Sequence, residues 1–203
     1  MEIPKLPKYL YRGDADPNNK RRLKETLNNG LLLTNLCSGG NGQEIFSNTL
    51  ENLINKHIAL SWDKTHFLSF STNEQTAYKY GSNGKEYNEI YNNELWDFTV
   101  LTFDTSRLTS SSIKQVEVGI YKAEFDPICK EFSPSYKVVL IDTLSYLKNI
   151  SDKSGIDCST AIKNAENDKE WLILPTSPFG YTGEFTAKFD TACISEKKKF
   201  RYT

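Results

Sequence analysis

Short runs of apolar and aromatic residues, each closed by turn-forming residues, recur through this chain and constrain its fold more than any other feature. Such runs are typical of β-strands, because β-branched and aromatic side chains pack well on a pleated surface. The clearest run covers residues 98–103, and the others cover residues 9–13, 66–72, 116–125, 136–142, 171–175 and 185–189. The sequence therefore predicts a chain in which strands outnumber helices.

Helical patterns are fewer, and they are concentrated in the N-terminal half. Each is marked by apolar residues at three- and four-residue spacing or by capping residues such as Asp, Asn and Gly. His57, for example, shares helical spacing with Leu53 and Ile54. The predicted helices cover residues 20–28, 50–57, 74–80 (with Gly81 as the stop) and 157–167. Together with the strands they predict an α+β fold with mostly antiparallel sheets.

The length and charge of the chain limit its domain number and its partners. A chain of 203 residues has the size of one domain. Its 25 basic and 26 acidic residues give a formal net charge of −1, which excludes nucleic-acid binding driven by bulk charge but not by a local patch. Basic and aromatic residues gather in the C-terminal segment 197–202. This segment could contact an acidic partner or RNA phosphates, and we predict a solvated tail.

Neither a membrane span nor a metal site is expected. No apolar run reaches the roughly 20 residues that cross a bilayer, and the N-terminus lacks the apolar core of a signal peptide. The four cysteines are scattered without a Cys-x-x-Cys pair, and only two histidines accompany them. We therefore expect a cytoplasmic protein, or one delivered to a target cell without a cleavable signal.

The first fragment with functional chemistry is Arg12, at the end of a predicted strand and directly before Gly13. An arginine held on a strand can point its guanidinium into a cleft, where it suits bidentate binding of a phosphate. Taken alone, Arg12 fits an exposed arginine in a turn better than a ligand-binding residue.

The second fragment covers residues 69–73, where small hydroxyl residues alternate with an aromatic one as a strand runs into a helix. Alternation places Ser69 and Ser71 on one face and Phe70 on the other. Ser71 and Thr72 fit an active-site strand or the N-cap of the next helix, and the two uses are compatible.

The third fragment is the segment 168–175, in which two carboxylates precede an apolar strand. If the backbone is extended, their two-residue spacing places Asp168 and Glu170 on the same side. A carboxylate beside an aromatic wall can bind a sugar hydroxyl and stabilise positive charge that builds on the ring. An ordinary solvated strand edge is the alternative.

Taken in order, the three fragments resemble the motifs of mono-ADP-ribosyltransferases of the cholera toxin type, the Arg-Ser-Glu group. The resemblance extends from residue 9 to about residue 178. Residues 11–14 resemble the start of that catalytic domain, residues 67–72 its Ser-Thr-Ser strand, and residues 168–175 its Glu-x-Glu strand.

The resemblance implies an ADP-ribosyltransferase-like fold in a single catalytic domain covering residues 1–203, with residues 109–156 as an insertion. Two small, mostly antiparallel sheets would form an NAD cleft between them. NAD would be a substrate, and no metal would be needed.

The resemblance also implies roles for single residues. Arg12, with Gly13, would bind the diphosphate or ribose of NAD, while Ser71 and Thr72 would orient the catalytic carboxylate. Glu170 would bind the ribose 2′-hydroxyl and stabilise an oxocarbenium-like transition state. Asp168 would orient or deprotonate the acceptor. Candidates for stacking on the nicotinamide are Tyr78, Tyr80 and Trp171.

Two departures from the family pattern and one rival motif leave alternatives open. Asn73 stands where the motif has its last Ser, and Asp168 stands where the family has Glu or Gln, which leaves the nucleophile specificity open. Glu117 is a rival for the catalytic carboxylate, since it enters a strand pattern 46 residues after Ser71, against 99 for Glu170. We favour Glu170 because residues 171–175 match the strand that follows in the family.

The resulting functional hypothesis is transfer of ADP-ribose from NAD to a protein side chain or a nucleic-acid base, with release of nicotinamide. A toxin or effector of a toxin–antitoxin or phage system would fit, with an antitoxin or immunity protein as partner. The alternatives are an NAD glycohydrolase and a non-catalytic binding module. His66, just before the Ser strand, is a further candidate base, although a structural role is the interpretation we favour.

Overall fold

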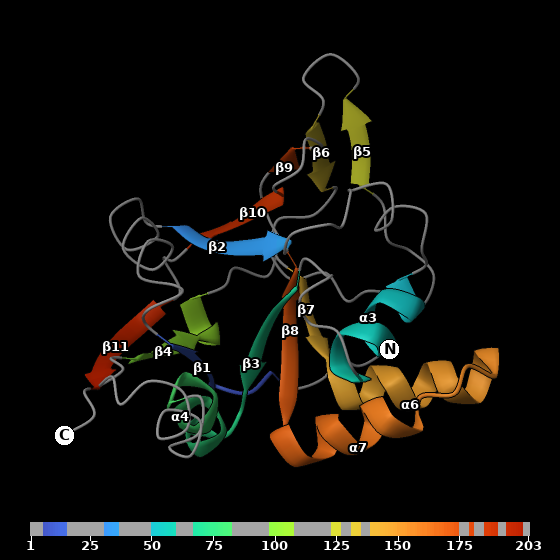
Figure 1. Cartoon of the computed structure of the whole chain (residues 1–203), viewed down its shortest axis with the longest axis horizontal. Coiled ribbons are helices and arrows are strands. Elements are labelled where there is room, and N and C mark those ends of the chain that lie inside the picture. The colour runs from blue at the N-terminus through green and yellow to red at the C-terminus, as the bar shows by residue number, and fades with distance from the viewer. Residues whose placement is uncertain are drawn as a thin grey trace, which may run out of the picture. The chain divides into compact units, whose positions relative to one another are not determined.

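The structure, a computed structural model, describes the parts of the chain that hold its main helices and strands (Figure 1). These parts are residues 6–15, 31–36, 50–59, 67–82, 98–107, 123–126, 131–134, 139–174, 179–180, 185–190 and 194–200. The predicted helix over residues 20–28, and the candidates His66 and Glu117, lie outside them. Contacts divide the chain into unit 1 (Met1–Leu32, Phe70–Leu108 and Asp190–Thr203) and unit 2 (Leu33–Ser69 and Thr109–Phe189).

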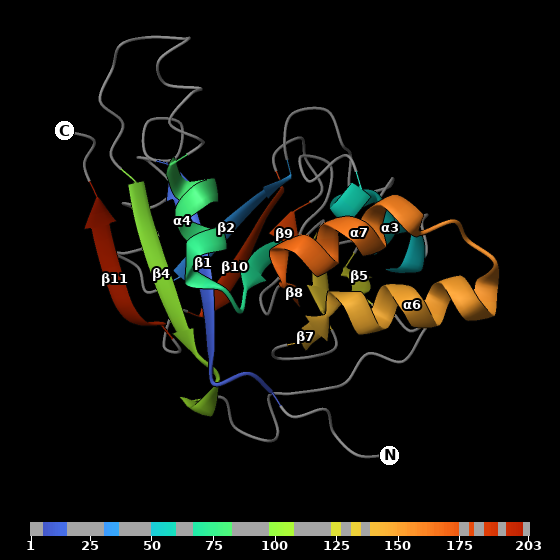
Figure 2. The ribbon, with the colours of Figure 1, turned by 90° about the horizontal axis from the view of Figure 1, so that it is seen from below.

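Unit 1 contains antiparallel strands in the order β11-β4-β1-β3. Figure 2 shows β11, β4 and β1 side by side, with helix α4 packed against β1. A 3-10 turn (Thr105–Arg107) follows β4. The elements are β1 (Tyr9–Ala15), β3 (Leu68–Ser71, of which Phe70 and Ser71 belong to unit 1), α4 (Glu74–Ser82), β4 (Phe98–Asp104) and β11 (Ile194–Phe200).

The two faces of this sheet are formed by alternate residues of each strand. On one face Phe98 and Val100 pack with Ala77 of α4 into a buried cluster. On the other face lie Leu10 and Leu101, both 0 % exposed. Because both faces of β4 are buried, its sequence reads as an almost continuous apolar run, which is why the pattern predicts this strand so clearly.

Helix α4 approaches β1 very closely at Gly13. A Cβ atom on Gly13 would overlap the carbonyl oxygen of Ala77 and lie 2.6 Å from the backbone nitrogen of Gly81. Only a residue without a side chain fits this contact between the helix and the strand. Gly13, predicted to bind NAD, therefore has a packing role in unit 1.

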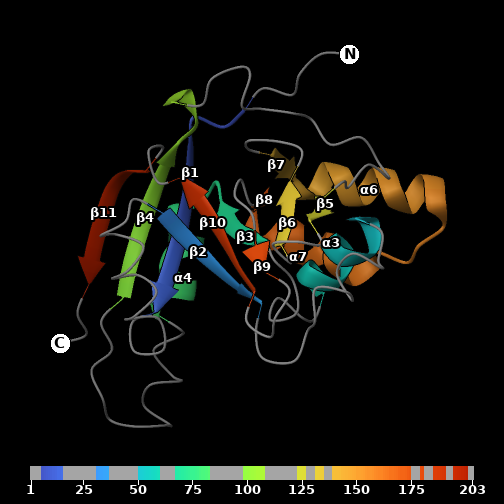
Figure 3. The ribbon, with the colours of Figure 1, turned by 90° about the horizontal axis from the view of Figure 1, so that it is seen from above.

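Three helices and two strands form the core of unit 2 (Figure 3). The helices α3 (Leu50–Ala59), α6 (Thr143–Ser154) and α7 (Ser159–Asp168) contact one another, and β7 (Val139–Asp142) pairs antiparallel with β8 (Glu170–Leu174). In the strand order β8 also adjoins β3, whose first two residues belong to unit 2. The most deeply buried apolar residues of this core are Ile54, Leu147, Ile150, Ala161, Ala165 and Leu172.

Two small sheets complete the described strands. One is an antiparallel sheet of three strands in the order β5-β6-β9, and the other is the pair β10–β2. Their strands are β5 (Ala123–Asp126), β6 (Glu131–Pro134), β9 (Phe179–Gly180), β10 (Phe185–Asp190) and β2 (Leu31–Leu36).

Helix α6 is absent from the predicted elements, although both of its ends carry clear signals. Asp142 is the N-cap, and its Oδ1 accepts the Ser145 N–H at 3.3 Å. Gly155 ends the helix in the left-handed conformation, with φ 69° and ψ 12°. Leu147 and Ile150 face the core at helical spacing. The segment that the resemblance marks as an insertion thus supplies part of the core of unit 2.

The α+β class with mostly antiparallel strands is confirmed. The predicted concentration of helices in the N-terminal half is wrong, because α6 and α7 begin only at Thr143 and Ser159. The described strands are also not confined to two small sheets. The two-sheet NAD cleft and the single catalytic domain remain predictions. No helix within the described residues is long and apolar enough to span a membrane.

We predict that Gly13→Ala lowers the free energy of unfolding by about 3 kcal/mol, because the new methyl group must displace α4 from β1. Gly155→Ala is the matched control. Its φ of 69° strains a side chain, but no atom lies within 4 Å of the added methyl group, so the expected loss is about 1 kcal/mol. Urea unfolding of both variants measures the difference. Equal losses would contradict the close packing at Gly13.

Candidate functional site

Arg12 lies in the middle of β1, directly opposite Leu101 of β4. Its side chain is half-buried, and β1 has paired neighbours on both sides, β4 and β3. The prediction that Arg12 lies on a strand is confirmed. The prediction that it ends the strand is wrong, because β1 continues to Ala15.

Ser71 ends β3 and forms part of the turn that leads into α4. It is only 4 % exposed, and its Oγ accepts the backbone N–H of Asn73 at 2.9 Å. The N-cap of α4 is Asn73, whose Oδ1 accepts the Gln75 N–H at 3.0 Å. The capping role predicted for Ser71 and Thr72 therefore belongs to Asn73, and Thr72 is exposed.

The register of β1 and β3 determines which of these side chains share a face. Ser71 pairs with Tyr11, so their side chains lie on the same face of the sheet, the face that α4 covers. Arg12, the next residue along β1, faces the opposite side. Arg12 and Ser71 thus lie on adjacent strands but on different faces, and the register does not bring them into one cleft.

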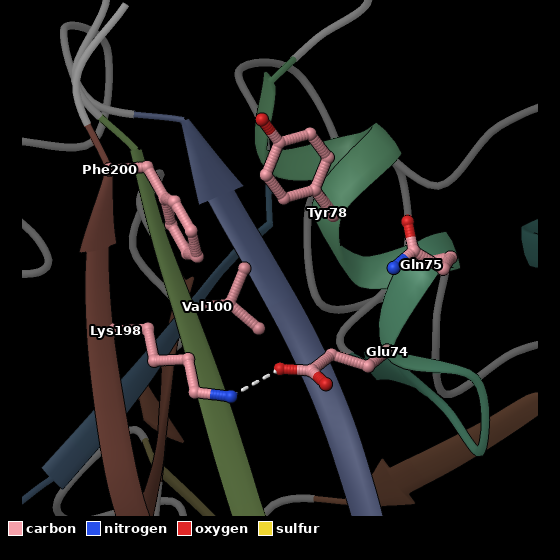
Figure 4. A pocket seen from close by; sticks show the side chains of 6 residues that line it. All are labelled: Glu74, Gln75, Tyr78, Val100, Lys198 and Phe200. Atoms are coloured by element: carbon pink, nitrogen blue, oxygen red, sulfur yellow. Dashed lines mark hydrogen bonds and ion pairs between the residues drawn. The ribbon is translucent and has the colours of Figure 1, made fainter.

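Tyr78 lies on the α4 side of the sheet, above a groove shown in Figure 4. Its ring meets the rings of Phe98 and Phe200 edge-on, at centroid distances of 5.0 and 5.3 Å. Tyr78 thus lies on the face of the sheet opposite to that of Arg12, and its stacking on a nicotinamide stays a prediction. The groove has a volume of about 440 Å³ and is lined by Glu74, Gln75, Tyr78, Val100, Lys198 and Phe200.

Two residues that line this groove form an ion pair. The Lys198 ammonium donates to Glu74 Oε1 at 2.6 Å, and Figure 4 shows the two groups pointing toward one another. This hydrogen bond raises the pKa of Lys198 above its ordinary value, and the charge of Glu196, 3.6 Å away, adds to the effect. Lys198 therefore stays protonated at neutral pH.

The acidic motif lies in unit 2, and its two carboxylates belong to different elements. Asp168 is the last residue of α7, while Glu170 is the first residue of β8. Between them Lys169 takes the left-handed conformation, with φ 50° and ψ 46°, and its N–H donates to the Ala165 carbonyl. The extended backbone on which the same-side prediction depended is absent, so strand alternation no longer relates Asp168 to Glu170.

Glu170 and Trp171 stand at the start of a strongly anchored strand. Both carboxylates of the motif are half-buried, whereas Trp171 is 8 % exposed and pairs with Asp142 of β7. The next residue, Leu172, is fully buried. Glu170 is thus held at the edge of a rigid core, which suits a carboxylate that must keep its orientation.

A histidine and a serine whose contact the sequence did not predict meet in unit 2. His57 Nε2 of α3 lies 2.8 Å from Ser69 Oγ of β3, and which atom donates depends on the tautomer. His57 is 6 % exposed and meets Phe67 edge-on at 5.4 Å. Helical spacing already placed His57 on the core face of its helix, but no local pattern indicated that this face meets Ser69.

The predicted site residues therefore fall into two groups. Unit 1 holds Arg12, Gly13, Ser71, Thr72 and Tyr78, and unit 2 holds Asp168, Glu170 and Trp171. Within the described residues, no three His, Cys, Asp or Glu side chains gather as metal ligands would. No protein-family model matches this chain, and no curated protein is significantly similar to it in sequence.

We predict that the His57–Ser69 hydrogen bond stabilises unit 2 by about 1 kcal/mol. A double-mutant cycle of His57→Phe and Ser69→Ala, followed by urea unfolding, should give a coupling energy of that size. The control cycle replaces Ser69→Ala by Ser154→Ala, because the Ser154 hydroxyl donates within its own helix to the Ile150 carbonyl. Additive effects in both cycles would show that the bond contributes nothing.

Proposed function

We propose that this protein is a mono-ADP-ribosyltransferase with an ADP-ribosyltransferase-like fold, which moves ADP-ribose from NAD to a macromolecular acceptor. The observation that carries the proposal is the strand that bears the serine motif. In unit 1, β3 pairs with β1, the strand of Arg12. In unit 2, β3 adjoins β8, which Glu170 opens. Motifs that are 59 and 99 residues from Ser71 in sequence thus stand on strands next to β3.

The chemistry of Arg12 supports a role in binding NAD. Its guanidinium offers donors in a fork that fits a diphosphate. The backbone beneath it is fixed by strand pairing and by the fully buried Leu10 and Leu101. A ligand group bound by Arg12 would therefore be held in a defined position.

Ser69 is better suited than Ser71 to orient the catalytic carboxylate. The Ser71 oxygen is buried and accepts the N–H that shapes the turn before α4. Ser69 is half-buried, is held by His57 and belongs to unit 2, as Glu170 does. We therefore transfer the orienting role predicted for Ser71 to Ser69, with His57 as its positioning residue.

Glu170 would act on the ribose that carries the nicotinamide. Its carboxylate accepts a hydrogen bond from the 2′-hydroxyl and stabilises positive charge as the C–N glycosidic bond breaks. Nicotinamide leaves with the bonding electron pair. The acceptor then attacks the anomeric carbon and loses a proton, which Asp168 can take. Trp171 supports the Glu170 backbone from the core, since its side chain is buried.

We predict that Glu170→Gln lowers the rate of nicotinamide release from NAD at least about 100-fold, because glutamine keeps the shape but not the charge. Chromatography of nicotinamide measures the reaction, and labelled NAD in a crude lysate reports transfer. The control is Glu166→Gln, an exposed carboxylate of α7 that pairs with Lys148 at 3.0 Å. Glu117→Gln should likewise leave the rate unchanged.

The outcomes of this experiment separate the alternatives. Loss of activity in Glu117→Gln but not in Glu170→Gln would move the site to the rival motif. Release of nicotinamide without a labelled acceptor would indicate an NAD glycohydrolase. Protein digestion and RNase treatment of the lysate identify the class of acceptor. A wild-type protein that neither binds nor cleaves NAD would overturn the proposal.

We predict that Arg12→Ala weakens NAD binding about 10-fold or more, because a charge-assisted hydrogen bond contributes roughly 1.5 to 3 kcal/mol. The affinity of Arg12→Lys for NAD should lie between those of the wild type and Arg12→Ala, since lysine keeps the charge but loses the bidentate geometry. Titration calorimetry measures both. Arg107→Ala is the control, because Arg107 is exposed and its ion pair with Asp104 is long, at 3.8 Å. An unchanged affinity of Arg12→Ala for NAD would contradict the role of Arg12 in NAD binding.

A further inference from the structure

The basic C-terminal segment is an edge strand and not the solvated tail that the sequence predicts. Residues 194–200 form β11, which pairs antiparallel with β4 from Ile194 to Phe200. β11 is the last strand in the order β11-β4-β1-β3, and among the described strands nothing pairs with its other edge. Within the described residues, its backbone N–H and C=O groups on that edge have no partner strand, and such groups can pair with a further strand.

The lysines of β11 divide between its two faces. Lys198 and Phe200 pair with Val100 and Phe98, so they lie on the face that carries the groove beneath α4. Lys197 and Lys199 point to the opposite face and are exposed.

The charges of these lysines are balanced on one face only. Lys198 already binds Glu74 at 2.6 Å and Glu196 at 3.6 Å. Lys197 and Lys199 form no ion pair with any described carboxylate. They leave two positive charges, two residues apart, on one face of an open strand.

The other face of this edge offers an apolar surface. The ring of Phe200 stacks on Phe98 at 4.8 Å, and Tyr78 covers both rings while remaining 42 % exposed. The groove beside them has a volume of about 440 Å³, room for a few side chains. One edge therefore combines open backbone groups, two lysines on one face and an aromatic groove on the other.

We propose that β11 binds an extended acidic segment of a partner protein, which adds to the sheet as a further strand. Side chains of an added strand alternate between the two faces. Acidic residues two apart would then lie opposite Lys197 and Lys199, while the apolar residue next along the added strand would lie opposite Phe200, on the face of Tyr78. The proposal is independent of the enzymatic function.

Other occupants match the edge less well. A second copy of β11 would bring the same lysines together, and like charges opposite one another destabilise a pair of strands. A nucleic acid would satisfy the lysines but not the row of backbone donors and acceptors. Lysines also protect edge strands from indiscriminate pairing, so a partner must supply the opposite charge to overcome them.

The test uses the full-length protein and a fluorescent peptide of alternating glutamate and valine. Anisotropy should show binding that weakens as salt rises. The variant Lys197→Glu/Lys199→Glu should bind at least about 10-fold more weakly. Its matched control, Lys153→Glu/Lys163→Glu, makes the same charge change at exposed positions of α6 and α7 and should bind as the wild type does. Circular dichroism and the midpoint of thermal unfolding check that both variants fold.

A second peptide tests the strand pairing itself. N-methylation of alternate backbone amides removes the donors needed for pairing but keeps every charge, and it should abolish binding. The proposal is overturned if the methylated peptide binds equally well, if both double variants lose affinity alike, or if a single-stranded RNA of equal charge binds more tightly. Because no step uses NAD, failure here is distinct from failure of the transferase proposal.

Discussion

The contact between Gly13 and helix α4 determines which side chains lie on each face of the sheet in unit 1. Because the α carbon of Gly13 faces the helix backbone, strand alternation turns Arg12 to the opposite face of the sheet. The same contact holds α4 close to β1, and from there Glu74 and Tyr78 reach across to β4 and β11. The absence of a side chain at Gly13 thus fixes which face of the sheet α4 covers, and Arg12 lies on the other face.

The same position shows why a motif residue can be interpreted in two ways. Gly13 follows Arg12 directly, and in sequence this resembles a glycine that lets a ligand approach the backbone. The structure gives it a different neighbour, the carbonyl of Ala77. A glycine required for helix packing and a glycine required for ligand contact leave the same mark in a sequence, because both need the absence of a Cβ atom. Only the fold distinguishes them.

The elements that the sequence predicted best are those whose burial follows a simple period. β4 is buried on both faces, and α3 and α7 bury one stripe each, so local pattern and tertiary environment agree. In β11 the lysines concealed the strand. Edge strands are often charged, and a charged segment has the sequence pattern of a solvated tail. The prediction that Asp168 and Glu170 lie on the same side was wrong because of one residue between them. Lys169 takes the left-handed conformation, where the helix that ends at Asp168 gives way to the strand that begins at Glu170. A lysine in that conformation has no local signature, because lysine is not among the residues enriched there.

The candidate site was harder to predict than the fold, because it includes contacts that no local sequence pattern indicates. His57 and Ser69 are twelve residues apart, yet their hydrogen bond exists only because α3 packs beside β3. Burial of His57 gives this contact its weight, since a buried imidazole without a partner is costly. Sequence spacing could show that His57 faces a core, but the identity of the group it meets depends on the packing of unit 2.

The overall charge of the chain also says little about function without the positions of the charges in the fold. A formal net charge of −1 predicts no strong attraction to any polyanion, because it sums 25 basic and 26 acidic residues without regard to position. Within β11 the pleat separates three consecutive lysines, and Glu74 neutralises only the one that faces α4. The remaining two act at short range, where neighbouring charges and not the sum over the chain determine the potential. A balanced composition is therefore compatible with a basic edge that selects an acidic partner.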